Sequence, residues 1–192
     1  MGQATLQTAR LELVPLGPEH KDFLYQLDSN ADVMKFIGYG KPLTAEESGI
    51  VLNHLMETAL PGSGLGCWAG FDDAGAFVGW WVLAPSQTSD EPPKLTTERT
   101  VFGFRVAPGF WGRGFAKEGS RELLRHGFQD LGVKEVLGDT MAINAGSRAT
   151  MATCGLKHIR TFHNQYDNPP PGIEEGEVEY RITQDEWLAL RK

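Results

Sequence analysis

The sequence predicts an α/β (α+β) fold in which helices flank one mixed sheet. Helical patterns cluster near the N-terminus, and three strand patterns then follow one another closely between residues 67 and 106. After residue 106, helix and strand patterns alternate as far as the C-terminus. The 192 residues are enough to bury a substantial core, so we expect one domain that spans residues 1–192.

The N-terminal part contains one strand pattern followed by helical patterns. Residues 10–16 alternate apolar and polar side chains, as a half-buried strand does. Pro18 begins a helical pattern, and residues 29–36 form a second, shorter one. Thr44 and Glu47 have the spacing of a capping box, which predicts that the next helix begins there.

The middle of the chain has the features of a three-strand meander. Residues 67–71 and 78–83 are two strand patterns separated by an Asp-Asp-Ala-Gly turn, which is typical of a hairpin. The polar, proline-containing segment 85–97 is predicted to be a long loop. Residues 100–106 are rich in β-branched and aromatic side chains and are predicted to form the third strand.

The C-terminal part alternates between helix and strand. The helical patterns span residues 118–129 and 144–153, and Gly155 supplies a left-handed stop to the second one. Thr183 and Glu186 have the spacing of a second capping box, which begins a terminal turn. The strand patterns in this part are 133–141, 159–162 and 178–182.

The charge balance argues against nucleic acid as a partner. The chain has 25 Asp or Glu residues and 18 Lys or Arg residues, so its formal net charge is −7. Non-specific binding to nucleic acid depends on clustered cations that release counterions, and an acidic chain is poorly suited to it. A basic partner such as an amine fits this charge better, although the same charge would also serve solubility alone.

The cysteines and the hydropathy favour a cytoplasmic protein. Cys67 and Cys154 are far apart, and no cluster has the spacing of a zinc site, so we expect no metal. Two scattered thiols are typical of a reducing compartment. Residues 1–10 lack the apolar run of a signal peptide. No stretch approaches the roughly 20 apolar residues that span a bilayer, so we expect no membrane partner.

The most informative segment is the glycine turn, Trp111-Gly112-Arg113-Gly114-Phe115-Ala116, which lies between a predicted strand and a predicted helix. Glycines permit positive φ and a close approach of the backbone to a ligand. The helix that follows presents unpaired amides and a partial positive charge, which suit a phosphate or pyrophosphate. The cation of Arg113 adds to this attraction.

Two other phosphate-binding motifs fit this segment poorly. A P-loop needs Gly-Lys-Ser/Thr after the turn, and that triplet does not occur here. A dinucleotide-binding fingerprint has a third glycine and follows the first strand of a parallel β-α-β unit. The glycine turn instead lies in mid-chain after a hairpin, which disfavours a nucleotide-dependent kinase or dehydrogenase.

The glycine turn resembles the acyl-CoA turn of the GNAT N-acetyltransferases, whose pattern is Gln/Arg-x-x-Gly-x-Gly/Ala. Trp111 stands where that pattern has Gln or Arg. The segment from Asn144 to Ser147 resembles the Asn-x-x-Ser of the branch that contains the ribosomal-protein N-terminal (Rim-type) acetyltransferases. The closing strand 178–182 and the start at Arg10 are also similar, so the resemblance covers nearly the whole chain.

The resemblance implies a fold and a reaction. The fold is a central, mostly antiparallel mixed sheet of about seven strands, splayed between strands four and five. The reaction transfers an acetyl group from the cosubstrate acetyl-CoA (coenzyme A) directly to a primary amine in a ternary complex. In the family, a backbone amide at a splayed, bulged strand polarises the thioester carbonyl. The residues that would bind the cofactor are Phe104, Arg105, Val106, Trp111, Gly112, Arg113, Gly114, Phe115, Ala116, Asn144 and Ser147.

Candidate catalytic residues follow from the same resemblance. Many GNAT enzymes place a proton-donating Tyr on the helix after the Asn, but the matching residue here is Met151. In the Rim-type branch the serine of Asn-x-x-Ser takes that role, so Ser147 is the first candidate to assist the leaving thiolate. Helix capping by Asn144 or Ser147 stays open as a further role. Tyr166 and His163 are secondary candidates for proton transfer.

The acceptor site is expected between the early helices and the strand 78–83. Its candidate residues are Phe36, Tyr39, Trp80 and Trp81, with core packing as the alternative role of each ring. The resemblance leaves open whether the acceptor is a peptide N-terminus or a small-molecule amine such as an aminoglycoside or a polyamine. It also leaves open the general base and a homodimer. A non-catalytic acyl-CoA-binding sensor is the alternative function, because Met151 replaces the Tyr.

Overall fold

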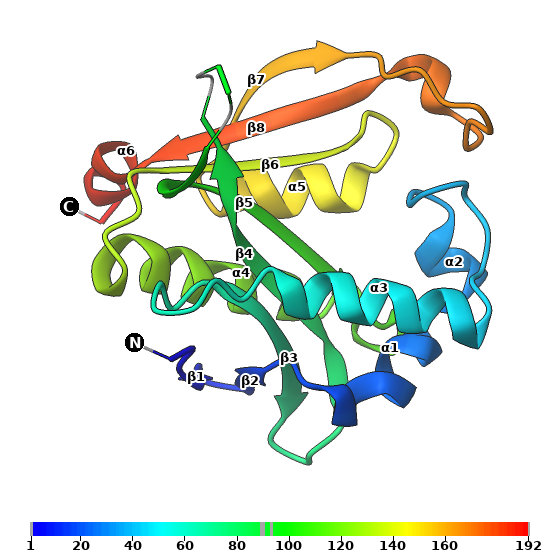
Figure 1. Cartoon of the computed structure of the whole chain (residues 1–192), viewed down its shortest axis with the longest axis horizontal. Coiled ribbons are helices and arrows are strands. Elements are labelled where there is room, and N and C mark those ends of the chain that lie inside the picture. Colours follow the sequence, from blue (N-terminus) through cyan, green and yellow to red (C-terminus); the bar gives the residue numbers. More distant parts are fainter. Residues whose placement is uncertain (1, 89–90, 93, 192) are drawn as a thin grey trace.

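The computed structural model describes residues 2–88, 91–92 and 94–191. Within them the strands form one sheet in the order β1-β2-β3-β4-β5-β6-β8-β7 (Figure 1). The strands are β1 (Leu6–Gln7), β2 (Leu11–Pro15), β3 (Gly66–Asp72), β4 (Phe77–Gln87), β5 (Leu95–Val106), β6 (Glu135–Met141), β7 (Lys157–Phe162) and β8 (Glu177–Thr183). The α-helices are α1 (Lys21–Asp28), α2 (Ala31–Met34), α3 (Ala45–Glu57), α4 (Phe115–Arg125), α5 (Ala145–Thr153) and α6 (Gln184–Ala189). Short helical turns lie at η1 (Pro18–His20), η2 (Pro108–Phe110), η3 (His126–Asp130) and η4 (Ile173–Glu175).

The sheet is mixed and mostly antiparallel, as the sequence predicts. β5 and β6 form a parallel pair, whereas the other neighbouring strands run antiparallel. The described sheet has 8 strands where the resemblance implied about seven. The difference is the short edge strand β1, which pairs with β2 through Leu6 opposite Leu13.

β5 and β6 separate part of the way along their length. Their pairing ends at Val101 opposite Leu137, yet β5 continues to Val106 and β6 continues to Met141. In Figure 1, β6, β7 and β8 run together across the upper part of the view, while β3 lies below. The predicted splay is therefore present between the fourth and fifth of the strands that the sequence predicts.

The register of β4 and β5 is regular beside this gap. Pairs run without interruption from Gly79 opposite Val106 to Pro85 opposite Thr100. The bulge expected in this described stretch of β5 is not seen, and the register shifts instead between Pro85 and Ser86. Pro85 has no amide to donate to the ladder, and a local irregularity is a usual way for a strand to accommodate proline.

The predicted loop 85–97 is largely a hairpin instead. β4 extends to Gln87, which pairs with Leu95 at the start of β5. The prediction relied on the prolines and polar residues of this segment, whereas β-branched threonines near the start of β5 favour a strand. Residues 89, 90 and 93 of the predicted loop lie outside the described residues.

Two hydrophobic clusters cover the two faces of the sheet. Helices α1 and α3 pack on one face, and α4 packs against β2, β4 and β5 on the other. Side chains alternate along β4, so Trp81 joins the cluster beneath α4 and Trp80 joins the cluster beneath α1 and α3. Gly119 lets α4 approach the sheet closely, since a Cβ there would lie 2.5 Å from the Trp81 ring.

Two helices begin at the capping boxes that the sequence predicts. Thr44 Oγ1 accepts from Glu47 N before α3, and Thr183 Oγ1 accepts from Glu186 N before α6, each at 3.3 Å. These bonds satisfy amides that have no acceptor within the helix. No helix among the described residues has the length and apolar character needed to cross a membrane.

Candidate active site

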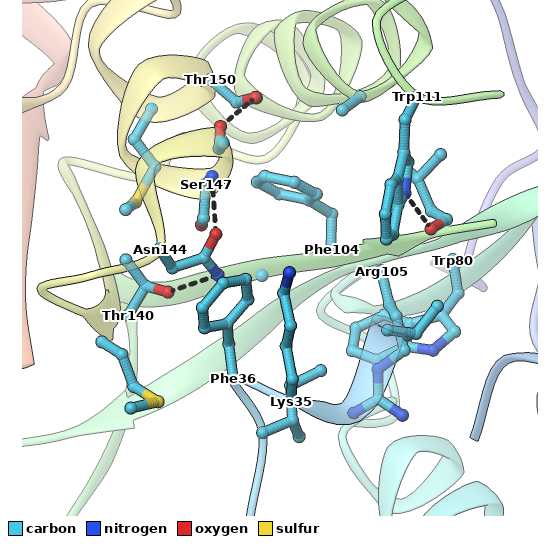
Figure 2. Close-up of a pocket in the computed structure, with 18 of the residues that line it drawn as sticks. Lys35, Phe36, Trp80, Phe104, Arg105, Trp111, Thr140, Asn144, Ser147 and Thr150 are labelled. Atoms are coloured by element: carbon cyan, nitrogen blue, oxygen red, sulfur yellow. Dashed lines mark hydrogen bonds between the residues drawn. The ribbon is translucent and has the colours of Figure 1, made fainter. Parts of the chain in front are cut away.

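The gap between β5 and β6 opens into a pocket of about 810 Å³. Its walls are the end of β5, the end of β6 with the start of α5, the glycine turn with the start of α4, and residues 35–38 after α2. Figure 2 shows side chains from these elements directed toward a shared space. A pocket of this size accommodates a cofactor or a drug-sized ligand.

The glycine turn forms one end of this pocket. Gly112 has φ +70° and Gly114 has φ +85°, a region that favours glycine. A Cβ at Gly112 would meet no heavy atom within 4 Å, so this position needs glycine for its backbone conformation. Gly114 is the N-cap of α4, whose first amides have no acceptor within the helix. Together with the helix dipole, these amides suit a phosphate group.

Two side chains hold the glycine turn in place. Trp111 Nε1 donates a hydrogen bond of 2.6 Å to the carbonyl oxygen of Val106, where β5 ends. Arg10 Nη1 donates to Arg113 O at 3.1 Å, and the guanidinium of Arg10 lies 4.2 Å from the centroid of the Phe115 ring. Sequence reasoning missed this role of Arg10, because a charged residue beside a strand usually faces solvent.

Glu118 links Arg10 to helix α4. Its carboxylate accepts from Arg10 N at 2.8 Å, from Arg10 Nε at 2.8 Å and from Thr8 Oγ1 at 2.7 Å. Burial alone would raise the pKa of Glu118, but these hydrogen bonds outweigh burial and lower the pKa. Glu118 is therefore ionised near neutral pH and keeps the N-terminal segment attached to α4.

A second groove of about 850 Å³ adjoins the glycine turn. It shares Gly114 and Lys117 with the pocket. The cations that line the groove suit phosphate groups of a ligand that extends past the turn. They are Arg10, Arg113, Lys117, Arg121, Arg125 and Arg191, of which Arg10 and Arg125 already pair with Glu118 and Glu122, which line the same groove. Two predicted cofactor residues thus lie outside the pocket: Arg113 lines the groove, and the Phe115 side chain is buried in the core.

Asn144 and Ser147 lie together at the start of α5 (Figure 2). Asn144 Oδ1 accepts from Ser147 N at 3.2 Å, and Asn144 Nδ2 donates to Thr140 Oγ1 at 3.1 Å. The side chain that caps α5 is therefore Asn144, and not Ser147. Both residues line the pocket, and the Ser147 hydroxyl makes no hydrogen bond within the described part of the chain. That hydroxyl is free to contact a ligand.

Tyr166 and His163 do not line the pocket. Tyr166 Oη donates to Glu177 Oε2 at 2.8 Å, and His163 Nε2 lies 3.3 Å from Glu174 O. Glu177 does line the pocket, so this hydrogen bond connects Tyr166 to the site. Burial raises the pKa of Tyr166, and the neighbouring Glu177 adds to the effect, so the phenol stays protonated near neutral pH.

Two of the four predicted acceptor residues, Phe36 and Trp80, line the pocket. Tyr39 is 61% exposed and lies outside the lining. Trp81 is fully buried on the opposite face of the sheet, where its Nε1 donates to Ala116 O at 3.3 Å. The sequence alone could have separated the two tryptophans, since neighbouring residues in a strand point to opposite faces.

Sequence reasoning missed four charged residues that line the pocket on α2, in the segment after it, on β6 and on β8: Asp32, Lys35, Asp139 and Glu177. Asp139 faces the open pocket, yet desolvation by the surrounding protein raises its pKa, and repulsion from Glu177 and Glu179 adds to this. A carboxylate with a raised pKa is a better proton acceptor near neutral pH. No group of three or more metal-binding side chains occurs among the described residues.

Arg105 takes part in a buried ion pair beside the pocket. Its guanidinium pairs with Asp28, which also accepts from Ser48 Oγ at 2.7 Å. The same guanidinium lies 5.1 Å from the centroid of the Trp80 ring, and Figure 2 shows both side chains on the far side of β5 from the Phe104 ring. Asp28 is fully buried, so the pair joins α1 and α3 to the end of β5.

Comparison with known proteins gives a family and a similar sequence. A family model described as an acetyltransferase (GNAT) domain matches residues 10–157. An Aspergillus fumigatus protein named FsC-acetyl coenzyme A-N(2)-transacetylase is 56% identical over 190 residues. The match covers 99% of this chain and 80% of that protein.

Solved structures share the fold at low sequence identity. RimL, a ribosomal L7/L12 alpha-N-protein acetyltransferase in complex with coenzyme A, gives a TM-score of 0.76 at 14% identity and covers 95% of this chain and 99% of its own. Spermidine N-acetyltransferase from Vibrio cholerae, in complex with CoA and spermine, gives a TM-score of 0.70 at 17% identity. The match covers 93% of this chain and 98% of that one. A GNAT-family acetyltransferase from Bacillus anthracis gives a TM-score of 0.74 at 18% identity, and the match covers 95% of this chain and 99% of that one.

Proposed function

Because the chain belongs to the GNAT acetyltransferase family, we propose that it acetylates the N(2) amine of FsC, or of a closely similar small molecule. Acetyl-CoA is the donor, and we infer that residues 1–192 form one catalytic unit. The identity of 56% to the Aspergillus protein supports an acceptor of the same kind. The observation that carries the proposal is one pocket with the glycine turn and the N-terminus of α4 at one end and carboxylates at the other.

The glycine turn is the proposed site of the CoA pyrophosphate. The amides that follow Gly114 at the start of α4 have no acceptor within the helix, and two glycines leave the backbone open to a ligand. The basic groove beyond the turn is suited to the remaining phosphate. The acetyl end of acetyl-CoA would then lie in the gap between β5 and β6, beside Asn144 and Ser147.

The free edge of β5 is the proposed donor to the thioester carbonyl. Ala107 N donates to Val78 O at 2.8 Å, toward β4. Because amides alternate in direction along a strand, those of Phe104 and Val106 point away from β4, toward the gap. The Val106 carbonyl accepts from Trp111 and so faces the same way. An amide aimed at an oxygen that gains negative charge lowers the barrier for attack by an amine.

Asp139 is the proposed general base. The amine must lose a proton as its nitrogen attacks the carbonyl carbon, and Asp139 lines the pocket opposite β5. Its raised pKa brings it closer to the range in which a base works at neutral pH. As the new C–N bond forms, the proton passes from the amine to Asp139, and the C–S bond then breaks to release CoA as a thiolate.

Ser147 is the proposed donor to the departing sulfur. Its hydroxyl lines the pocket and is unpaired within the described chain, because Asn144 already caps the helix. A thiol with an ordinary pKa near 8.5 is a fair leaving group, so a hydrogen bond is sufficient assistance.

Incubation of the enzyme with acetyl-CoA and FsC tests this function. We expect CoA thiol release at a rate that depends on FsC and a product one acetyl group heavier than FsC. Tandem mass spectrometry should locate the acetyl group on N(2). Thiol release with other amines but not with FsC would retain the acetyltransferase and reject this acceptor.

A further inference from the structure

The part of the pocket that would receive the amine carries charges of both signs, from Asp32 and Lys35 at one side and from Asp139 and Glu177 at another. Lys35, from the segment after α2, lines one side of the pocket. Asp139 on β6 and Glu177 on β8 line the other side. An acceptor that bears only amines would suit the carboxylates of this region but would be repelled by the ammonium group of Lys35.

Lys35 is held in the pocket by the helix that precedes it. Asn30 caps α2 by accepting from Asp32 N at 3.0 Å and from Val33 N at 3.3 Å, and the side chains of Val33 and Met34 are buried. Lys35 is the C-cap of this anchored turn. Its position is therefore set by the core, although its side chain is exposed to the pocket.

The ammonium group of Lys35 is not neutralised by the protein around it. Its Nζ lies 4.8 Å from the centroid of the Phe36 ring, and Figure 2 shows both side chains extending into the pocket. Asp32 also lines the pocket, yet no carboxylate oxygen of the described residues lies within 4.0 Å of Lys35 Nζ. An ammonium group with three donors and no acceptor of its own is available to an oxygen of the ligand.

Glu177 differs from Lys35 because it already has partners. It accepts from Tyr166 Oη at 2.8 Å and from Asn164 Nδ2 at 2.6 Å. These contacts hold the Glu177 carboxylate on the acidic side of the pocket. Glu177 is therefore held in place by its partners, whereas the Lys35 ammonium contacts only the Phe36 ring among the described residues.

We propose that Lys35 determines acceptor specificity by binding a carbonyl or carboxylate oxygen next to the carbon that bears the reacting amine. This inference rests on the proposed function and adds a residue that contacts the acceptor and determines which acceptors bind. An α-amino acyl group has the required chemistry, because it offers an amine to a carboxylate such as Asp139 and a carbonyl oxygen to Lys35, both of which line the pocket. Hydrogen bonds to a charged donor are among the stronger ones in proteins.

The same ammonium group disfavours polyamines. A second amine placed near Lys35 would bring like charges together, which opposes binding. It would also meet a donor where it needs an acceptor. This structure therefore combines an attractive contact for one class of acceptor with a repulsive contact for another.

A matched pair of acceptors tests Lys35 directly. Alaninamide and 1,2-diaminopropane share a carbon skeleton. The carbonyl group beside the amino carbon of alaninamide is a CH2 group in the diamine, and the uncharged amide nitrogen is a second basic amine, so acetylation is followed at the 2-amino group of each compound. We expect the wild-type enzyme to have the higher kcat/KM for alaninamide. Lys35→Met should lower kcat/KM for alaninamide and for FsC by about tenfold or more, as is usual for loss of a charged hydrogen bond. The same variant should leave or improve turnover of the diamine.

Lys35→Glu and Lys41→Met complete the test. Lys35→Glu should reverse the preference toward the diamine, because the charge at this position is then inverted. Lys41 lies in the same connection between α2 and α3 but outside the pocket lining. Lys41→Met should therefore keep the wild-type ratio of kcat/KM for alaninamide to kcat/KM for the diamine. Thermal melting checks that each variant folds.

Two results would overturn the inference. One is a wild-type preference for the diamine, and the other is a Lys35→Met enzyme whose ratio of kcat/KM values equals that of the wild type. Either result is compatible with acetylation of FsC, so it is distinct from failure of the proposed function. Failure of the proposed function would instead appear as no acetylation of FsC by the wild-type enzyme.

Discussion

The indole nitrogen of Trp111 donates a 2.6 Å hydrogen bond to the carbonyl oxygen of Val106. This bond joins the glycine turn, the proposed phosphate site, to the end of the strand whose free amides face the gap. The GNAT pattern has Gln or Arg at the position of Trp111, so the chain departs from that pattern but gains a contact between the two parts of the site.

Loss of the Trp111 donor should weaken CoA binding. Trp111→Phe keeps an aromatic ring and removes the nitrogen, so the turn loses its bond to β5. We expect an increase of about tenfold in the Kd for CoA, which is the size of one hydrogen bond of ~1 to 1.5 kcal/mol. Isothermal titration calorimetry measures this change. An unaltered Kd would mean that the turn holds its shape without the bond.

Gly114 should be required both for the turn and for the phosphate. Gly114→Ala introduces a side chain at φ +85° and should cost about 1 kcal/mol or more in stability. Gly114→Asp adds the same strain together with a negative charge at the helix N-terminus. CoA binding should therefore be weakened by the alanine and abolished by the aspartate. Equal CoA affinities for the two variants would remove the electrostatic part of the argument.

Alanine variants of Asn144 and Ser147 should separate an effect on stability from an effect on turnover. Asn144→Ala removes the cap of α5 and should lower stability by about 1 kcal/mol. Ser147→Ala removes no cap, so its melting temperature should stay near that of the wild type. Its kcat should fall by about tenfold with little change in the KM for acetyl-CoA, because the hydroxyl assists only the departing thiolate. A wild-type kcat for Ser147→Ala would exclude Ser147 from the mechanism.

The buried pair of Asp28 and Arg105 should be costly to break from one side. Asp28→Asn leaves the Arg105 guanidinium buried without its counter-charge, and we expect a loss of about 3–5 kcal/mol in the free energy of unfolding. Urea unfolding measures this loss. The double variant Asp28→Leu, Arg105→Met removes both charges and should recover most of it. A double variant no more stable than Asp28→Asn would contradict the electrostatic cause.

Local patterns in the sequence were sufficient to predict most of the fold and the glycine turn at one end of the pocket. Capping boxes at Thr44 and Thr183 and the glycine turn are short-range features, and each is present in the structure. The hairpin beyond Pro85 was wrongly predicted to be a loop. Local composition does not indicate that the end of β4 forms backbone hydrogen bonds with the start of β5.

The acceptor end of the site depends on contacts between residues far apart in the sequence. Lys35, Asp139 and Glu177 come from three separate elements, and only the folded sheet brings them to one pocket. The role of Arg10 likewise depends on its contact with Glu118 on α4. No spacing in the sequence indicates these contacts, whereas the placement of Trp80 and Trp81 on opposite faces could have been derived from strand alternation.

The pH dependence of FsC acetylation by the wild-type enzyme and by Asp139→Asn tests the central claim most directly. Protonation removes the base, so wild-type kcat/KM should fall as pH falls, at a higher pH than an ordinary aspartate would require, because the pKa of Asp139 is raised. Asp139→Asn should be slower by about 100-fold or more near neutral pH, with unchanged affinity for CoA. An Asp139→Asn enzyme with the wild-type rate and pH profile would contradict the account.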